Sequence, residues 1–355
     1  MLRERLQNYH ITGYHWVFQQ TAFHMINKLQ FALQATLLGT DERAAPCAAV
    51  TAHTLVGSQG ARHYLLATPG GTTGTTGDRR ALVIILHGAG ASARQALGMA
   101  FPPSPLSVWL EIAERDGVLV AAPDAGKGGW NGCLVSSAQV ASKDDVAFIG
   151  ALIDEAIARH YADPARVYVI GVSKGGLMAY RLALELTGRL AAFSAVLASM
   201  PLPGRFTMPE TPLSALIFGC TADPMMRYAG GKFFYSPLDP VSSIEDSAAI
   251  WHVHAGLPET PAVHAIPRRD PKARTHATRY LWGEGGEAGD GLQVGLYKIE
   301  HAGHAEPSAR KRYPRLINWV TGVQNGDFEV AEAAWEFFRH KRAGRTCAVE
   351  HTLMV

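Results

Sequence analysis

The stretch VYVIGVSKGG at positions 167–176 decides the fold. Its first residues, up to Ile170, are mostly β-branched or aromatic and predict a buried strand, and a helix-forming run, 177–186, follows the glycines directly. Between strand and helix lies a Gly-x-Ser-x-Gly turn centred on Ser173, the pattern of a nucleophile elbow, which lifts the serine above the edge of a sheet. Glycine is needed on both sides because this turn is tight and strained. The stretch therefore predicts an α/β sheet that carries a nucleophilic serine.

A simpler interpretation is that Ser173 only caps the helix that follows it. At ordinary residue usage the three fixed positions arise by chance in roughly one chain in ten of this length, so the motif alone is weak. An accidental match would more often fall in a loop than between a strand and a helix. The context therefore favours a catalytic serine.

The rest of the chain supports one large α/β domain. Beyond about Pro46, expected strands and helices alternate, which is typical of a mostly parallel sheet with helices on both faces. We expect an accessory helical segment at 1–45, a catalytic domain at 46–342 and a tail at 343–355. The expected strands are 63–67, 80–86, 118–122, 195–198, 215–219 and 292–299, and the expected helices are 107–114, 144–160, 245–254 and 330–338.

Composition narrows the class of protein without naming its activity. The chain has 355 residues, of which 47% are hydrophobic and 18% charged, which is enough for one substantial core. A formal charge of +2 does not favour nucleic acid or an anionic membrane as a partner. The four cysteines lie far apart and form no metal-binding pattern with each other or with histidine. The cysteines do not settle the redox compartment, and a reaction that proceeds through a nucleophilic serine needs neither a metal nor a cofactor.

The N-terminal region has apolar character but no run long enough to span a membrane. Its best apolar stretch, 31–38, is interrupted by Gln34 and lacks a small-residue cleavage site, so it does not read as a secretory signal. We therefore favour a cytoplasmic protein without a clear membrane anchor. The alternative is secretion of a chain that starts at Met25.

A serine hydroxyl is a weak nucleophile, so Ser173 needs a histidine as base and an acid that orients it. In this kind of fold both follow the serine, in loops at the carboxyl ends of late strands. One such loop contains Asp223, and the loop after the last strand offers His301 and His304. Asp223 could instead be a turn residue before a proline, and Asp124, at another strand end, is its main rival.

Several segments resemble the polyhydroxybutyrate depolymerase family of esterases, which also includes feruloyl and acetylxylan esterases. The resemblance covers roughly residues 64–339. It implies an α/β-hydrolase fold in which Ser173, Asp223 and His304 form a catalytic triad, and it favours His304 over His301. The segments that carry it best are His87-Gly88, Gly171 to Gly176, Gly219-Cys220-Thr221-Ala222-Asp223 and Gly303-His304.

Further roles follow from the fold and from local composition. The amides of Lys174 and Ala89 are the expected oxyanion-hole donors, because they occupy the two positions that the fold uses for this purpose. His87, beside Ala89, is an expected substrate-binding residue, although the His-Gly step could be a plain strand-ending turn. Trp130 is a second candidate, since an aromatic residue in a Gly-rich loop is not easily placed in a core.

Three departures from the family pattern affect the expected substrate. Members commonly have Cys where this chain has Ala89, a small residue where it has Lys174, and Thr-Trp-Pro where it has residues 305–307. The last change removes an apolar wall, and Lys174 and Glu306 are expected to add charge near the mouth of the cleft. We expect hydrolysis of 3-hydroxyalkanoate esters or oligomers. The alternatives are a feruloyl or acetylxylan esterase, a peptidase or acyltransferase, and an inactive binding protein that keeps the fold.

Overall fold

A computed structural model describes most of the chain and all of the expected site residues. The described residues are 48–57, 60–70, 79–132, 143–186, 188–233, 236–284 and 291–344. The expected N-terminal segment 1–45 lies outside them, as does nearly all of the expected tail 343–355. Cys47, Cys133 and Cys347 also lie outside, whereas Cys220 is buried as a free thiol.

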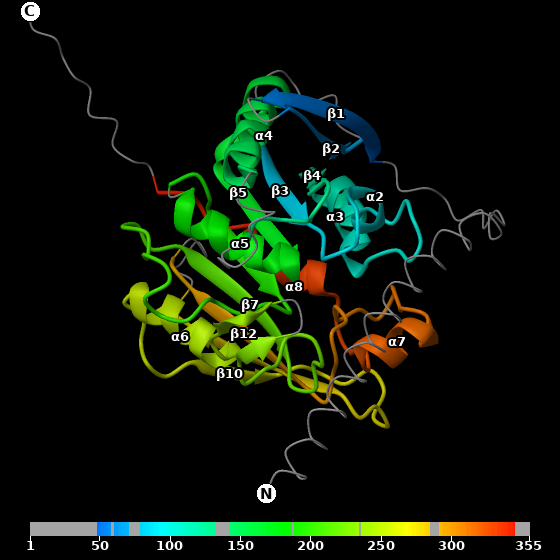
Figure 1. The fold of residues 1–355 in the computed structure, drawn as a ribbon, viewed down its shortest axis with the longest axis vertical. Helices are drawn as coiled ribbons and strands as arrows, with labels where there is room; N and C mark the ends of the chain where they lie inside the picture. The colour runs from blue at the N-terminus through cyan, green and yellow to red at the C-terminus, as the bar shows by residue number, and fades with distance from the viewer. Residues whose placement is uncertain are drawn as a thin grey trace, which may run out of the picture.

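The centre of the molecule is a ten-stranded sheet in the order β1-β2-β4-β3-β5-β6-β7-β12-β11-β10 (Figure 1). Neighbouring strands from β4 to β12 run parallel, and the strands at both edges are antiparallel. The expected mostly parallel sheet is therefore confirmed. Its strands are β1 Ala49–Gly57, β2 Gly60–Thr68, β3 Arg80–Leu86, β4 Leu119–Pro123, β5 Ala162–Val172, β6 Ala192–Val196, β7 Ser214–Cys220, β10 Ala262–Ala265, β11 His276–Trp282 and β12 Val294–Glu300. A separate hairpin pairs β8 Gly231–Phe233 with β9 Ser236–Val241.

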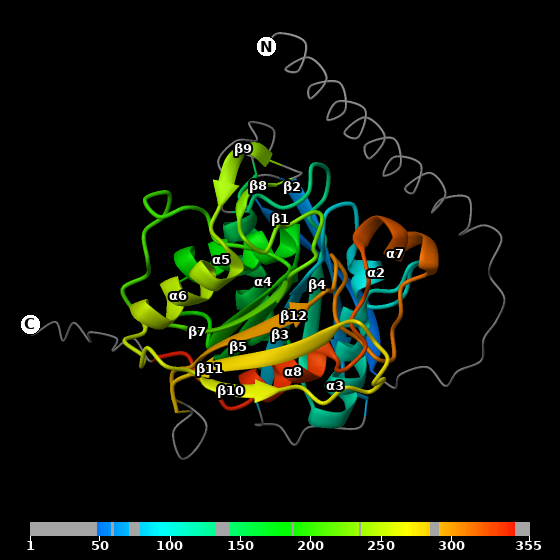
Figure 2. The same cartoon turned by 90° about the horizontal axis from the view of Figure 1, so that it is seen from below.

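Helices cover both faces of the sheet, as Figure 2 shows. One face packs against α4 (Asp145–Arg159), α5 (Lys174–Glu185) and α6 (Ile244–His254). The other packs against η1 (Pro105–Val108), α3 (Trp109–Asp116) and α8 (Val330–Phe338). Two short helices, α2 (Ala93–Ala96) and α7 (Arg315–Thr321), lie near the ends of the parallel strands.

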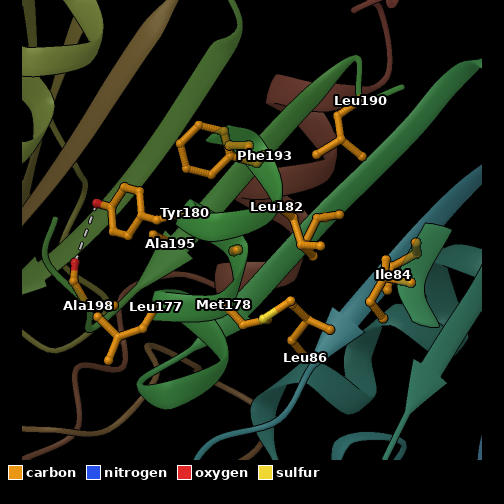
Figure 3. Packing of buried hydrophobic residues seen from close by; sticks show 14 of the residues in the cluster. Ile84, Leu86, Leu177, Met178, Tyr180, Leu182, Leu190, Phe193, Ala195 and Ala198 are labelled. Atoms are coloured by element: carbon orange, nitrogen blue, oxygen red, sulfur yellow. Dashed lines mark hydrogen bonds between the residues drawn. The ribbon is translucent and has the colours of Figure 1, made fainter. Parts of the chain in front are cut away.

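Side chains of the central strands alternate between two hydrophobic clusters. In β3, Leu82, Ile84 and Leu86 belong to the cluster on the α5 face, whereas Val83 and Ile85 belong to the cluster on the α8 face. Figure 3 shows part of the first cluster, where residues of β3, α5 and β6 meet. Burial on both faces explains why these strands are continuous apolar runs instead of alternating patterns.

Most expected elements are present with small changes in their ends. The strand 80–86 and the helix 330–338 have the predicted bounds, and α4 begins and ends one residue inside the predicted 144–160. The edge strands β1, β10 and β11 and the helix α7 were not predicted. No helix in the described ranges has the length and apolar character to cross a bilayer.

Candidate active site

The turn between β5 and α5 has the strained geometry expected of a nucleophile elbow. Ser173 adopts φ +54° and ψ −116°, a backbone conformation that side chains other than glycine rarely occupy. A Cβ atom on Gly171 would lie 2.1 Å from the carbonyl oxygen of Gly175. A Cβ atom on Gly175 would lie 2.3 Å from the carbonyl oxygen of Leu86. Both glycines are therefore required by close backbone contact.

Ser173 does not act as an ordinary helix cap. It occupies the N-cap position of α5, all of whose residues are described, yet its side chain makes no capping hydrogen bond there. Its amide donates to the carbonyl of Val196, which ties the turn to the neighbouring strand. The hydroxyl is therefore available for another role.

Substitution of Gly175 by alanine should severely destabilise the protein. The added methyl group would meet backbone atoms of β3 that cannot move without disturbing the sheet, and overpacking of this kind costs about 3 kcal/mol or more. Chemical denaturation followed by circular dichroism measures the loss. Gly57→Ala is the matched control, because no atom lies within 4 Å of a Cβ built there. Equal stability of the two variants would contradict the tight packing of the elbow.

The structure brings Asp223 and His304 into direct contact. Asp223 follows β7 and His304 follows β12, and these two strands are parallel neighbours, so their carboxyl ends meet. The Nδ1 atom of His304 lies 2.6 Å from Oδ2 of Asp223. The other carboxylate oxygen of Asp223 accepts from the amides of Met225 and Met226 at 2.7 and 2.8 Å. The carboxylate is thus fixed on both sides and can orient the imidazole.

The two rival residues lie elsewhere. His301 is exposed, and its ring lies near that of His276 at a centroid distance of 6.0 Å. Asp124 accepts from the amide of Ala93 and lies 3.8 Å from Nε2 of His87. Of the candidate pairs, the histidine and acid that bond each other are therefore His304 and Asp223.

The surroundings of His304 favour its protonated form. Burial by itself disfavours the charged imidazolium, but the charge of Asp223 and its hydrogen bond, together with the charge of Glu306, outweigh burial and raise the pKa of His304. Because Nδ1 is bound to Asp223, proton exchange with another group is left to Nε2. This is the arrangement that a general base requires.

A pocket of about 180 Å³ joins the elbow to the loop that carries His304. Both Ser173 and His304 line it. Most of its wall is apolar, from the loop after β3, from α2 and η1, and from α7, whereas Ser104, Glu306 and Tyr313 form a polar part. The apolar side chains include Ala89, Ala91, Ala96, Pro102, Leu106, Val172, Met225, Ile317 and Val320.

Glu306 places a buried carboxylate in the pocket wall. Only 5% of the residue is exposed. Its Oε1 atom accepts from the Ser104 hydroxyl at 3.0 Å, and its Oε2 atom accepts from the Tyr313 hydroxyl at 2.9 Å. Burial and the nearby charge of Glu306 raise the pKa of Tyr313, so the phenol stays protonated and donates. The sequence predicts charge from Glu306 near the cleft, but it does not indicate Ser104 or Tyr313 as partners.

The side chain of Lys174 does not line the pocket that contains Glu306. Its ammonium group donates to the carbonyl of Gly128 at 3.0 Å, in the loop before Trp130. Burial lowers the pKa of this lysine, and the nearby charge of Lys143 acts in the same direction. The expected charge at the pocket therefore comes from Glu306, whereas the side chain of Lys174 is held by the adjoining loop.

The loop after β3 runs beside the elbow. A Cβ atom on Gly88 would lie 3.6 Å from the Cβ of Ser173, and Ala89 lines the pocket next to it. Lys174 begins α5, where amides at a helix N-terminus lack partners within the helix. Both positions are close to Ser173, and the oxyanion-hole role of their amides remains a prediction.

His87 holds this loop through both ring nitrogens. The amide of Ala125 donates to Nε2 at 3.2 Å, so Nδ1 carries the proton and donates to the carbonyl of Gly88 at 2.8 Å. Burial lowers the pKa of His87, which keeps the ring neutral. His87 lines the pocket, as expected of a substrate-binding residue, but any substrate contact must use its ring carbons.

Trp130 lies in a core, contrary to the expectation that an aromatic residue in this Gly-rich loop is not easily buried, and it does not line the pocket of Ser173. The structure buries this residue to 1% exposure within the hydrophobic core, although its loop is rich in glycine. Its Nε1 atom donates to the carbonyl of His87 at 2.9 Å, and the two rings lie 5.3 Å apart. The indole can be buried because its one polar atom is satisfied there. Trp130 therefore supports the loop that carries His87 and Ala89.

Comparison with known proteins finds esterases among the relatives of this chain. No protein-family model matches the sequence. The chain is 27% identical over 303 residues to "Putative esterase NocK" of Nocardia uniformis subsp. tsuyamanensis, a match that covers 82% of this chain and 83% of that protein. It is 26% identical over 239 residues to feruloyl esterase B of Piromyces equi, which covers 66% of this chain but only 41% of the relative.

A solved structure supports the fold. Acetyl xylan esterase from Aspergillus awamori superposes with a TM-score of 0.50, over 82% of this chain and 99% of the other, at 13% identity. Together with the parallel sheet and the elbow, this likeness gives the chain the α/β-hydrolase fold. The named relatives and this structural neighbour are all esterases.

Proposed function

We propose that this α/β-hydrolase, whose named relatives are esterases, hydrolyses carboxylic esters with Ser173 as the nucleophile. One observation carries the proposal more than any other. The imidazole of His304, bonded to Asp223, lines the same pocket as a serine on a strained elbow. Nucleophilic acyl transfer requires a hydroxyl that faces the pocket, an oriented base and a buried acid.

The proposed reaction has two steps with one covalent intermediate. The Ser173 oxygen attacks the ester carbon while Nε2 of His304 takes its proton, and the amides of Lys174 and Ala89 stabilise the developing oxyanion. Collapse of the tetrahedral intermediate expels the alcohol, which receives the proton from His304 and leaves an acyl-serine. Water then attacks with His304 again as base, His304 returns the proton to the Ser173 oxygen, and the acid is released. Asp223 stabilises the imidazolium in both steps.

Glu306 narrows the proposed substrate class. Each carboxylate oxygen can accept two hydrogen bonds, so capacity remains after Ser104 and Tyr313 have been satisfied. A hydroxyl group on the acyl chain could donate to it, whereas an anionic group there would be repelled in a largely apolar pocket. These properties fit an uncharged 3-hydroxyalkanoate ester. A second candidate is a feruloyl ester, because one named relative is a feruloyl esterase and ferulate also carries a hydroxyl group.

An ester panel tests both the activity and the role of Glu306. A 3-hydroxybutyrate ester should be hydrolysed with a kcat/KM about 10-fold above that of the matching butyrate ester, which corresponds to one hydrogen bond to a charged group. Glu306→Gln should bring the two values within about 3-fold of each other, because the amide is a weaker acceptor. Glu300→Gln is the control, since this carboxylate lies at the end of β12 and pairs with Lys298.

Methyl ferulate and acetylated xylan complete the panel. If only the ferulate ester is hydrolysed, the proposed substrate becomes a feruloyl ester and not a 3-hydroxyalkanoate ester. Equal rates for hydroxylated and plain acyl groups would exclude a contact between Glu306 and the acyl hydroxyl, but they would not exclude the esterase activity. Absence of turnover for every ester would contradict the proposed function and favour a binding protein that keeps the fold.

A further inference from the structure

A second cluster of polar side chains lies away from the pocket, between the first edge strand and a helix. It consists of His53 in β1, Glu155 in α4 and His160, the C-cap residue of α4. One nitrogen or oxygen atom from each residue lies within 4.8 Å of the others. All three side chains are partly buried. We propose that this cluster binds a divalent transition-metal ion, with Zn²⁺ as its representative.

The cluster contains polar atoms that are buried and poorly satisfied. Among the residues that the structure describes, Oε2 of Glu155 and Nε2 of His160 make no hydrogen bond of ordinary geometry, and each exposes less than 1 Å². The buried hydroxyl of Tyr64 is the group nearest to a partner for Glu155, whose carboxylate raises the pKa of that tyrosine. Buried polar atoms in native proteins are normally satisfied, so those gathered in this cluster call for an explanation. A metal ion would satisfy both Glu155 and His160.

Neighbouring residues hold the His53 ring in place. Across the β1–β2 hairpin, Tyr64 stacks on it at a centroid distance of 4.9 Å, and the ring of His160 meets it edge-on at 5.1 Å. The Thr51 hydroxyl lies 2.7 Å from Nε2 of His53. A metal-binding histidine usually donates its second ring N–H to a carboxylate, a backbone carbonyl or water, and a hydroxyl oxygen can accept the same bond. The oxygen of Thr51 is thus suited to orient His53.

The donor set indicates which ions fit. Two imidazoles and one carboxylate are typical ligands of Zn²⁺ and related ions, whereas Ca²⁺ and Mg²⁺ prefer oxygen donors alone. In a tetrahedral zinc site with bonds near 2.1 Å, ligand atoms lie about 3.4 Å apart. The ligand atoms would therefore approach one another by up to about 1.4 Å, and a water molecule would fill the fourth position.

One nearby cation competes with the ion. Nη1 of Arg159 lies 3.7 Å from Oε1 of Glu155. The Arg159 side chain is 76% exposed, so it can turn toward solvent when the ion binds. The pair is an exposed i,i+4 contact, which contributes little to stability.

The proposed ion has a structural role. β1 is the outermost strand on its side of the sheet, and the ion would join it to the end of α4. None of the three ligands lines the pocket that contains Ser173. The site is therefore separate from ester hydrolysis, for which the proposed reaction uses no metal.

Zinc titration of the full chain, without an affinity tag and after treatment with a chelator, tests the site. Calorimetry should give one tightly bound Zn²⁺ per chain, and saturation should raise Tm by about 3 °C. His53→Ala, Glu155→Gln and His160→Ala should each weaken binding by at least about 10-fold. Ca²⁺ should leave Tm unchanged.

His63→Ala is the matched control. His63 lies on the same hairpin, is exposed, and pairs with the Thr54 hydroxyl at 2.9 Å, so its loss should leave zinc affinity unchanged. Glu155→Gln keeps the shape of the side chain, so a loss of zinc binding in this variant reports the missing carboxylate and not a folding defect. The proposal is overturned if wild type binds no zinc below about 100 µM, or if the three variants keep the wild-type affinity. Esterase rates are not needed for either result.

Discussion

Substitution of Ser173 by alanine is expected to lower kcat for hydrolysis of p-nitrophenyl butyrate by about 10⁶-fold, or about 8 kcal/mol in activation free energy. The reason is chemical, because alanine offers no oxygen to form the acyl intermediate. Binding of the ester and the folded structure should survive, since the change removes a single atom that caps no helix. The measurement is release of p-nitrophenol, with near-UV circular dichroism as a check on the fold.

Ser194→Ala is the control for this experiment. Ser194 is a fully buried serine in β6, and its hydroxyl has no hydrogen-bond partner within the described part of the chain. It lies outside the pocket lining, so its removal should leave kcat unchanged. Equal rates for wild type and Ser173→Ala would exclude Ser173 as the nucleophile and with it the proposed mechanism.

The second large loss of kcat is expected for Asp223→Asn. An asparagine keeps the shape of the side chain but favours the wrong tautomer of His304, and in a serine triad such a change lowers kcat by about 10⁴-fold. The pH profile should change as well. In wild type, the raised pKa of His304 means that activity falls as pH drops through a value above the ordinary one for histidine. Loss of the Asp223 charge should move this acidic limb to lower pH.

Asp124→Asn distinguishes the two candidate acids. Asp124 lies near His87 and has no contact with His304 among those that the structure describes, so this variant should keep the wild-type acidic limb. The pH dependence of kcat/KM gives both results in one assay. A limb that moves in Asp124→Asn but stays in place in Asp223→Asn would reverse the assignment of the acid.

The buried parts of the fold could be predicted from sequence, and the edges of the sheet could not. β3 and α8 appear with the predicted bounds because each is a continuous apolar pattern with clear ends. β10 is a short strand whose residues are all exposed, so it carries no hydrophobic period. β11 is mostly half-buried and mixes apolar with charged residues. Such strands are defined by their neighbours, which the local sequence does not contain.

The same distinction applies to the candidate site. Asp223 and His304 could be named in advance because this kind of fold carries its acid and base in loops after late strands, and the family resemblance favours His304 over His301. The burial of Trp130 could not, since it depends on the carbonyl of His87, 43 positions away. The polar part of the pocket has a similar origin, because Ser104 meets Glu306 across 202 positions. No motif marks these two pairs, so only the folded chain reveals them.

The order of the three proposed catalytic groups along the chain matters during synthesis. A nascent polypeptide that has emerged from the ribosome through β7 already carries Ser173 and Asp223 but lacks the imidazole that would join them. Because domains of this size assemble their sheet from distant segments, β12 can add His304 only after its own segment has been synthesised and has paired with β7. Each newly made chain would therefore lack the proposed hydrolase activity until the last parallel strand has docked.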